Sequence, residues 1–187
     1  MNPMNNTAPQ RRRTMRLQGY DYSQAGAYFI TIVTQGRMCL FGDVVDGETR
    51  LNDAGRLAQA VWDELPRHYP NVELDAFVIM PNHVHGIIVL VGAGLKPALA
   101  GVGDGLGAGL KPAPTKCAPL SEIVRAFKTF SARRVNEYRR APGLSVWQRN
   151  YYEHIIRSEK ALDRIREYIA TNPLQWSMDR ENPAKNI

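Results

Sequence analysis

The chain of 187 residues is long enough for one domain with a buried core and too short for two domains of ordinary size. With 44% hydrophobic and 22% charged residues it has the composition of a soluble globular protein, and no apolar run approaches the ~20 residues of a membrane span. Its 24 Lys and Arg residues against 18 Asp and Glu residues leave a net charge of +6, which favours a polyanionic partner.

Cysteine usage and the N-terminus predict a reducing, cytoplasmic location. Cys39 and Cys117 lie far apart in the sequence, which suggests neither a disulfide framework nor a thiolate metal site. The first residues are polar and arginine-rich, and they lack the apolar block of a secretory signal.

The chain divides into an arm, one domain and a short tail. Residues 1–18 are interpreted as a flexible basic arm, which is either a solvated, frayed end or a segment that contacts phosphates. The arginines that would make such contacts are Arg11, Arg12 and Arg13. The domain is expected over residues 19–176, and residues 177–187 are assigned to a C-terminal tail.

The first half of the domain reads as strand, helix, strand, strand. Residues 28–34 are dense in β-branched and aromatic types, which predicts a strand. A helix opens at Asn52, with apolar residues spaced four apart on one face, and Pro66 lies near its end. Residues 72–80 and 83–91 are predicted as two further strands joined by a Pro-Asn turn.

Residues 92–119 differ in composition from the rest of the chain. The heptad at 92–98 recurs at 107–113 as a tandem duplication within a Gly/Ala/Pro-rich segment. Such a composition buries too little apolar surface to offset the entropy of ordering. The segment contains no placeable dinucleotide or P-loop motif, so we interpret it as a mobile insertion.

The second half predicts helix, strand, helix. A long helix follows Pro119, residues 146–156 read as a fourth strand, and a last helix runs from a Ser158 cap to Thr171. The order β-α-β-β-α-β-α, without its last helix, matches an α+β, ferredoxin-like antiparallel sheet with two helices on one face. We therefore expect the additional C-terminal helix on the open face of the sheet.

His83 and His85 form the sharpest local signal. Side chains alternate along a strand, so both imidazoles project from one face while Val84 projects from the other. Two imidazoles at this spacing can bind one divalent ion. A hydrogen-bonded pair without a metal is the alternative, because this short pattern also arises by chance.

The last helix can bring a phenol and an amide to this face. Leu162, Ile165 and Ile169 form its packing stripe, and Tyr168 and Asn172 lie beside that stripe. If the stripe docks on the histidine face, Tyr168 and Asn172 point towards the imidazoles. The alternative is an amphipathic edge tyrosine and a helix-terminating asparagine.

Together these motifs resemble the REP-associated tyrosine transposases, relatives of the IS200/IS605 single-tyrosine transposases in the HUH endonuclease superfamily. The resemblance rests on four segments in family order: 28–34, 80–86, 146–154 and 166–173. It covers about residues 20–176 and leaves out the Gly/Ala-rich insertion.

The resemblance implies both fold and chemistry. Relatives have a ferredoxin-like sheet and cleave single-stranded DNA beside hairpins, through a 5′-phosphotyrosine intermediate and with a divalent metal ion. Carried over by position, His83 and His85 are metal ligands and Tyr168 is the nucleophile. The third ligand in relatives is often a glutamine one turn after the tyrosine, where this chain has Asn172. The expected ion is Mg²⁺ or Mn²⁺, and the expected location is cytoplasmic, with the nucleoid.

Several further residues are candidates for DNA contacts. Tyr151 and Tyr152 lie on the predicted fourth strand and point to opposite faces, so at most one of them competes with Tyr168 as nucleophile, and the alternative role is packing or base stacking. Lys128, Arg133 and Arg134 suit phosphate contacts, although a solvated helix face explains the first two equally well. Arg134 falls near the apolar stripe of its helix, so we expect a carboxylate or phosphate partner for it.

The expected partner is single-stranded or hairpin DNA, with no membrane partner, and the protein is either a monomer or a homodimer. Two functional alternatives stay open at this level. One is a binding module for structured nucleic acid that has lost catalysis, and the other is a nickase of the replication or conjugation type. An ordinary metal-dependent phosphodiesterase is a third possibility.

Overall fold

The computed structural model describes residues 21–92 and 118–186. The predicted basic arm with Arg11, Arg12 and Arg13, and nearly all of the predicted insertion, therefore lie outside the described residues. The main elements are β1 (Gly26–Val33), β2 (Gly42–Val45), β3 (Glu48–Leu51), α1 (Asp53–His68), β4 (Val72–Ile79), β5 (His83–Leu90), α2 (Leu120–Tyr138), β6 (Tyr152–Ile156) and α3 (Glu159–Thr171). None of the described helices combines the length and the apolarity that crossing a membrane requires.

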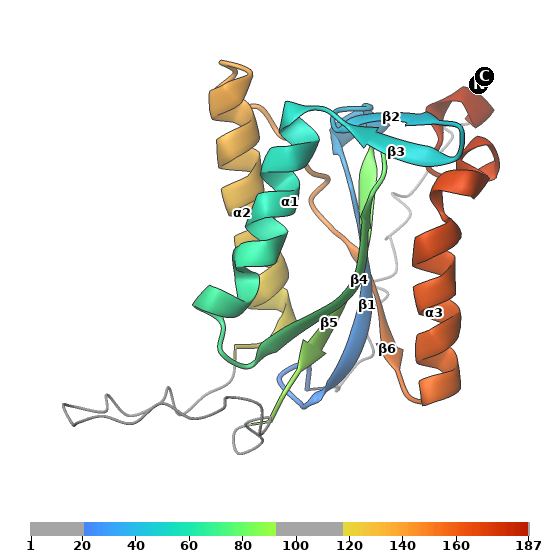
Figure 1. Cartoon of the computed structure of the whole chain (residues 1–187). Coiled ribbons are helices and arrows are strands. Elements are labelled where there is room, and N and C mark those ends of the chain that lie inside the picture. The colour runs from blue at the N-terminus through green and yellow to red at the C-terminus, as the bar shows by residue number, and fades with distance from the viewer. Residues whose placement is uncertain (1–20, 93–117, 187) are drawn as a thin grey trace, which may run out of the picture.

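The central sheet has the strand order β4-β5-β1-β6, and all three pairings are antiparallel. Helices α1 and α2 cover one face and α3 covers the other, so the molecule has three layers (Figure 1). This arrangement confirms the predicted α+β, ferredoxin-like antiparallel sheet with an additional C-terminal helix.

The larger core lies between the sheet and the helices α1 and α2. On β5 the side chains of Val84 and Ile88 face this core and are fully buried there. Trp62 of α1 stacks on Phe77 of β4 with ring centroids 4.1 Å apart. Helix α1 begins as predicted, because the Asn52 side chain accepts a hydrogen bond from the Gly55 amide at 3.0 Å.

A smaller core lies between the other face of the sheet and α3. Its buried members are Phe29, Ile87, Ile156 and Ile169, and the predicted stripe residues Leu162 and Ile165 pack against them. The Ser158 side chain caps α3 by accepting a hydrogen bond from the Ala161 amide. The prediction that the last helix covers the histidine face of the sheet is thus confirmed.

Two features of the fold differ from the sequence prediction. The two-stranded sheet of β2 and β3 precedes α1 and was not predicted, since its strands have only four residues each. The predicted strand 146–156 is shorter and begins at Tyr152. Before it, Trp147 makes an isolated bridge to Thr34, and its indole donates to Ser131 Oγ in the core at 2.9 Å.

Candidate metal centre and active site

His83 and His85 lie at the start of β5, on the face that α3 covers. Their side chains are 0% and 4% exposed, and their Nε2 atoms face one another at 3.0 Å. Two ligand nitrogens about 2.1 Å from one ion, at a right angle to each other, are separated by about 3 Å. The spacing of the two Nε2 atoms is therefore that of a pair of ligands to a single metal ion.

Asn82 determines which nitrogen of His83 carries the proton. Its Nδ2 donates to the backbone carbonyls of Arg37, at 3.1 Å, and Glu181, at 2.7 Å. Carbonyls only accept, so the orientation of the amide is fixed and its Oδ1 faces His83 Nδ1 at 2.8 Å. Neutral His83 therefore carries its proton on Nδ1, and the lone pair of its Nε2, which faces His85 Nε2 at 3.0 Å, can accept a hydrogen bond or bind a metal ion.

Thr31 contacts Nδ1 of His85 in the same way, but it does not determine which nitrogen of His85 carries the proton. Its Oγ1 lies 2.8 Å from His85 Nδ1. A hydroxyl can donate or accept, so His85 can carry its proton on either nitrogen. When Thr31 accepts, His85 Nε2 is also available as a ligand, and hydrogen bonds of this kind orient metal-binding imidazoles in general.

Both imidazoles are held in the neutral form that a metal ion requires. Burial lowers the pKa of His83 to about 4, although the carboxylate of Asp179 acts in the opposite direction. Burial also lowers the pKa of His85 well below 6.5, and the proximity of His83 adds to this shift. Near neutral pH neither ring is protonated, so neither must lose a proton to bind a cation.

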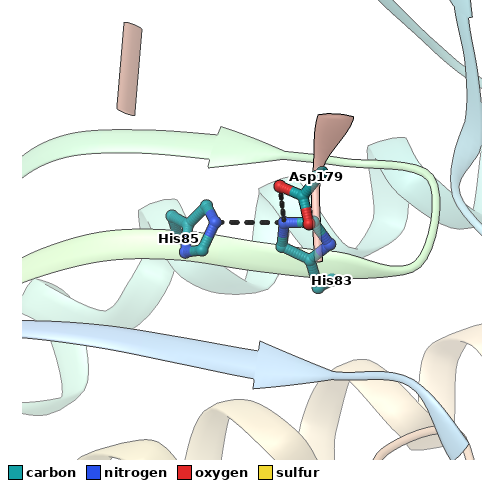
Figure 2. Close-up of side chains that lie close together, drawn as sticks. All are labelled: His83, His85 and Asp179. Atoms are coloured by element: carbon teal, nitrogen blue, oxygen red, sulfur yellow. Dashed lines mark hydrogen bonds and ion pairs between the residues drawn. The ribbon is translucent and has the colours of Figure 1, made fainter. Parts of the chain in front are cut away.

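Asp179 joins the two histidines from the C-terminal end of the chain. Its Oδ2 lies 3.9 Å from His83 Nε2, and Figure 2 shows the carboxylate beside the nitrogen that faces His85. Ligand atoms of the three residues all lie within 4.8 Å of one another, so this group could hold a metal ion. Asp179 was missed in the sequence, where it stands in the segment assigned to the tail and belongs to no spaced motif.

Asn172 directly follows α3 and faces the same centre. It is 2% exposed, and its Oδ1 has no hydrogen-bond partner among the residues that the structure describes. Burial is the main cause of the lowered pKa of His83 and of the raised pKa of Tyr168. The Asn172 side chain shifts each of these pKa values in the opposite direction, so it lies beside both groups. An unpartnered, buried amide oxygen beside two imidazoles and a carboxylate fits a divalent ion, and such a mixed donor set admits Mg²⁺ and Mn²⁺.

Tyr168 lies on α3 with its hydroxyl 3.3 Å from His85 Nε2. The phenol is 41% exposed and packs edge-on against the ring of Phe29. Burial raises its pKa, and the negative charge of Asp179 adds to this effect. In this environment the phenol keeps its proton more firmly than in water, so a nearby positive charge is needed to make its oxygen a good nucleophile.

A cavity of about 600 Å³ opens over Tyr168 and His85. Phe29, Tyr152 and Asn172 also line it, together with the carboxylate-bearing residues Asp179 and Glu181.

The two tyrosines that compete with Tyr168 lie on opposite faces of the sheet, as strand alternation predicts. Tyr152 lies in this cavity, whereas Tyr151 packs against the core on the other face of the sheet.

The predicted phosphate-binding residues of α2 lie in the layer on the opposite face of the sheet. Lys128 Nζ donates to the backbone carbonyls of Gln148 and Arg149, and burial lowers its pKa. Arg133 is exposed. Arg134 has the expected carboxylate partner, because its two terminal nitrogens donate to the carboxylate of Glu64 at 3.0 and 2.7 Å.

Similar proteins are known at the level of sequence and of structure. No family model matches the chain. An uncharacterized protein of Haemophilus influenzae is 40% identical over 178 residues, which are 94% of this chain and 95% of that protein. A second protein of this organism, assigned by name to the REP-associated tyrosine transposases, is 28% identical over 155 residues, 83% of this chain and 74% of that protein. A solved REP-associated tyrosine transposase bound to a REP hairpin has a TM-score of 0.55 at 20% identity, over 87% of this chain and 74% of that chain.

The antiparallel sheet with helices on both faces is thus the fold of a transposase-like protein. The chain belongs to one family with the 40% identical Haemophilus protein, and within this class it is a relative of the REP-associated tyrosine transposases, as its sequence motifs indicate.

Proposed function

We propose that this protein is a metal-dependent endonuclease and strand transferase that cleaves and rejoins single-stranded DNA near hairpin-forming repeats. The single observation that carries the proposal is the position of the Tyr168 hydroxyl, 3.3 Å from an imidazole nitrogen that itself lies 3.0 Å from a second one. The relatives support the substrate class, since one of them is a transposase bound to a REP hairpin.

Each residue of the centre has a role in this mechanism. His83, His85 and Asn172, with Asp179 as an additional ligand, would hold the divalent ion. Once bound, the ion would polarise the scissile phosphate and neutralise the charge that gathers on its oxygens. Asn82 and Thr31 would keep the proton of each imidazole away from the ion, on Nδ1.

Tyr168 would attack the scissile phosphorus with its phenolic oxygen. The new bond joins phosphorus to the tyrosine oxygen, and the bond from phosphorus to the 3′-oxygen of the preceding nucleotide breaks. The phenolic proton leaves to the carboxylate of Glu181, which lines the cavity and is close enough to raise the pKa of Tyr168, and the departing 3′-oxygen takes up a proton to become a hydroxyl. Because the phosphotyrosine ester conserves the phosphodiester bond energy, a 3′-hydroxyl can attack it and rejoin the strands.

Denaturing electrophoresis of the protein with a hairpin-bearing single strand and Mn²⁺ or Mg²⁺ tests the proposal. A strand labelled at its 3′ end should become linked to the protein, while a 5′-labelled strand should yield a free fragment with a 3′-hydroxyl. Tyr168→Phe should abolish the linked product, and His83→Ala should weaken it through loss of metal. Tyr152→Phe is the matched control, because Tyr152 lines the same cavity.

Two outcomes would contradict this assignment. A linked product that survives in Tyr168→Phe and disappears in Tyr152→Phe would make Tyr152 the nucleophile. Clean cleavage of the DNA without any protein-linked product would identify a hydrolase that uses water.

A further inference from the structure

A second hollow lies on the other side of the strand that borders the active-site cavity. It has a volume of about 330 Å³ and runs between one face of α2 and residues 144–151, the segment that leads from α2 into β6. In Figure 1 this segment descends from the end of α2 towards β6. We call this hollow the α2 groove.

The α2 groove carries positive charge without compensating acids. Arg125, Lys128 and Arg149 line it, and none of the described residues along it bears a carboxylate. Arg125 and Arg149 are exposed. Lys128 is held in place by its hydrogen bonds to the carbonyls of Gln148 and Arg149, at 2.7 and 2.8 Å, so its ammonium group is fixed in the wall. Three cations along one groove attract a chain of phosphates.

The α2 groove and the active-site cavity lie on opposite faces of the sheet beside the same edge strand. β6 is the last strand in the order β4-β5-β1-β6. Tyr151, just before it, lines the α2 groove, and Tyr152, its first residue, lines the cavity. Consecutive side chains of an extended strand point to opposite faces, so a strand of DNA that passes around this edge would run from one hollow to the other.

We infer that the α2 groove binds the phosphate backbone of single-stranded DNA that continues from the active-site cavity around the edge of β6. This inference rests on the proposed function, because it assigns the path of that substrate. The binding is electrostatic and independent of base sequence, with Arg125 and Arg149 as the phosphate contacts.

Binding of a fluorescein-labelled oligothymidylate, measured by fluorescence anisotropy in chelator at several salt concentrations, tests the inference. Arg125→Ala and Arg149→Ala should each weaken binding roughly fivefold at low salt and reduce the slope of log K against log salt by about 0.7. Arg67→Ala is the matched control: it removes an exposed arginine of α1 outside the groove and should leave affinity and slope unchanged. Both groove arginines are exposed, so their loss should not affect folding.

The inference is overturned if both groove variants bind with the affinity and salt slope of the unchanged protein, or if Arg67→Ala loses as much. It is also overturned if the unchanged protein does not bind oligothymidylate. Failure of the proposed function gives a different result. The unchanged protein would bind the oligothymidylate and the groove variants would bind it more weakly, yet no protein-linked product would form when metal is added.

Discussion

The hydroxyl of Tyr168 lies 3.3 Å from Nε2 of His85, across a sequence separation of 83 residues. Docking of α3 on the sheet produces this contact, with Ile169 buried against Phe29 and Ile87. An ion pair adds to the docking, since Arg166 of α3 donates to both carboxylate oxygens of Asp75, at 2.9 and 2.6 Å. The position of the phenol thus depends on how a whole helix packs.

Replacement of Asn82 should weaken metal binding although Asn82 is not itself a ligand. Asn82→Ala removes the acceptor of His83 Nδ1–H and leaves two backbone carbonyls without their donor. We expect a loss of about 10- to 100-fold in Mn²⁺ affinity by calorimetry, and a fall of about 1–3 kcal/mol in the free energy of unfolding.

Asn71→Ala is the matched control for Asn82→Ala. Its amide also donates to a backbone carbonyl, that of Ala118 at 3.3 Å, but it is not bonded to either histidine. It should lose some stability and keep its Mn²⁺ affinity. Unchanged Mn²⁺ affinity in Asn82→Ala would show that the asparagine has no part in preparing His83.

Gly86 allows the close approach of Trp62 to the strand that carries the histidines. A Cβ atom at this position would lie 2.6 Å from Trp62 Cη2 and 2.8 Å from Phe77 Cδ2, so the stacked rings must move. Gly86→Ala should therefore reduce the free energy of unfolding by about 1–3 kcal/mol in urea denaturation. Gly26→Ala, on β1, meets nothing closer than 3.8 Å and should be nearly neutral. Equal stability of the two variants would disprove this reading of the packing.

Stability in metal-free solution should depend on pH through the histidine pair. Burial lowers the pKa of His83 from 6.5 to about 4 and the pKa of His85 well below 6.5. Below pH 6.5 the unfolded chain binds protons that the folded protein excludes, so the free energy of unfolding falls as the pH drops from about 6.5 to 4. Urea midpoints in chelator should be lower at pH 5 than at pH 7. The difference should shrink in His85→Ala and persist in His68→Ala, and a midpoint independent of pH would refute the prediction.

Much of the fold could be predicted because it depends on sequence patterns that span only a few residues, namely hydrophobic periodicity and helix caps. The strand of β5 and the stripe of α3 follow from periods of two and 3.6 residues, and the caps Asn52 and Ser158 act within a few residues of their own positions. The hairpin of β2 and β3 was not predicted, because strands of four residues are too short to show a clear alternation of apolar and polar residues. The strand predicted from residue 146 was too long, because apolar and aromatic side chains are typical both of a strand and of a buried loop, and residues 146–151 pair with the chain just after β1 through an isolated bridge, Thr34 to Trp147, rather than through a continuous ladder.

The sequence by itself determined that two imidazoles share one face of a strand, and that a phenol in the last turn of a helix and an amide at its end lie side by side. The fixed geometry of a strand or a helix determines on which face each side chain lies relative to its neighbours in the sequence. Only the tertiary structure decided that Asp179 joins the imidazoles and that Asn82 orients His83 while donating to the carbonyl of Glu181. Those contacts join segments about a hundred residues apart, and they form only when the hydrophobic faces of the sheet are covered and the chain end packs against them.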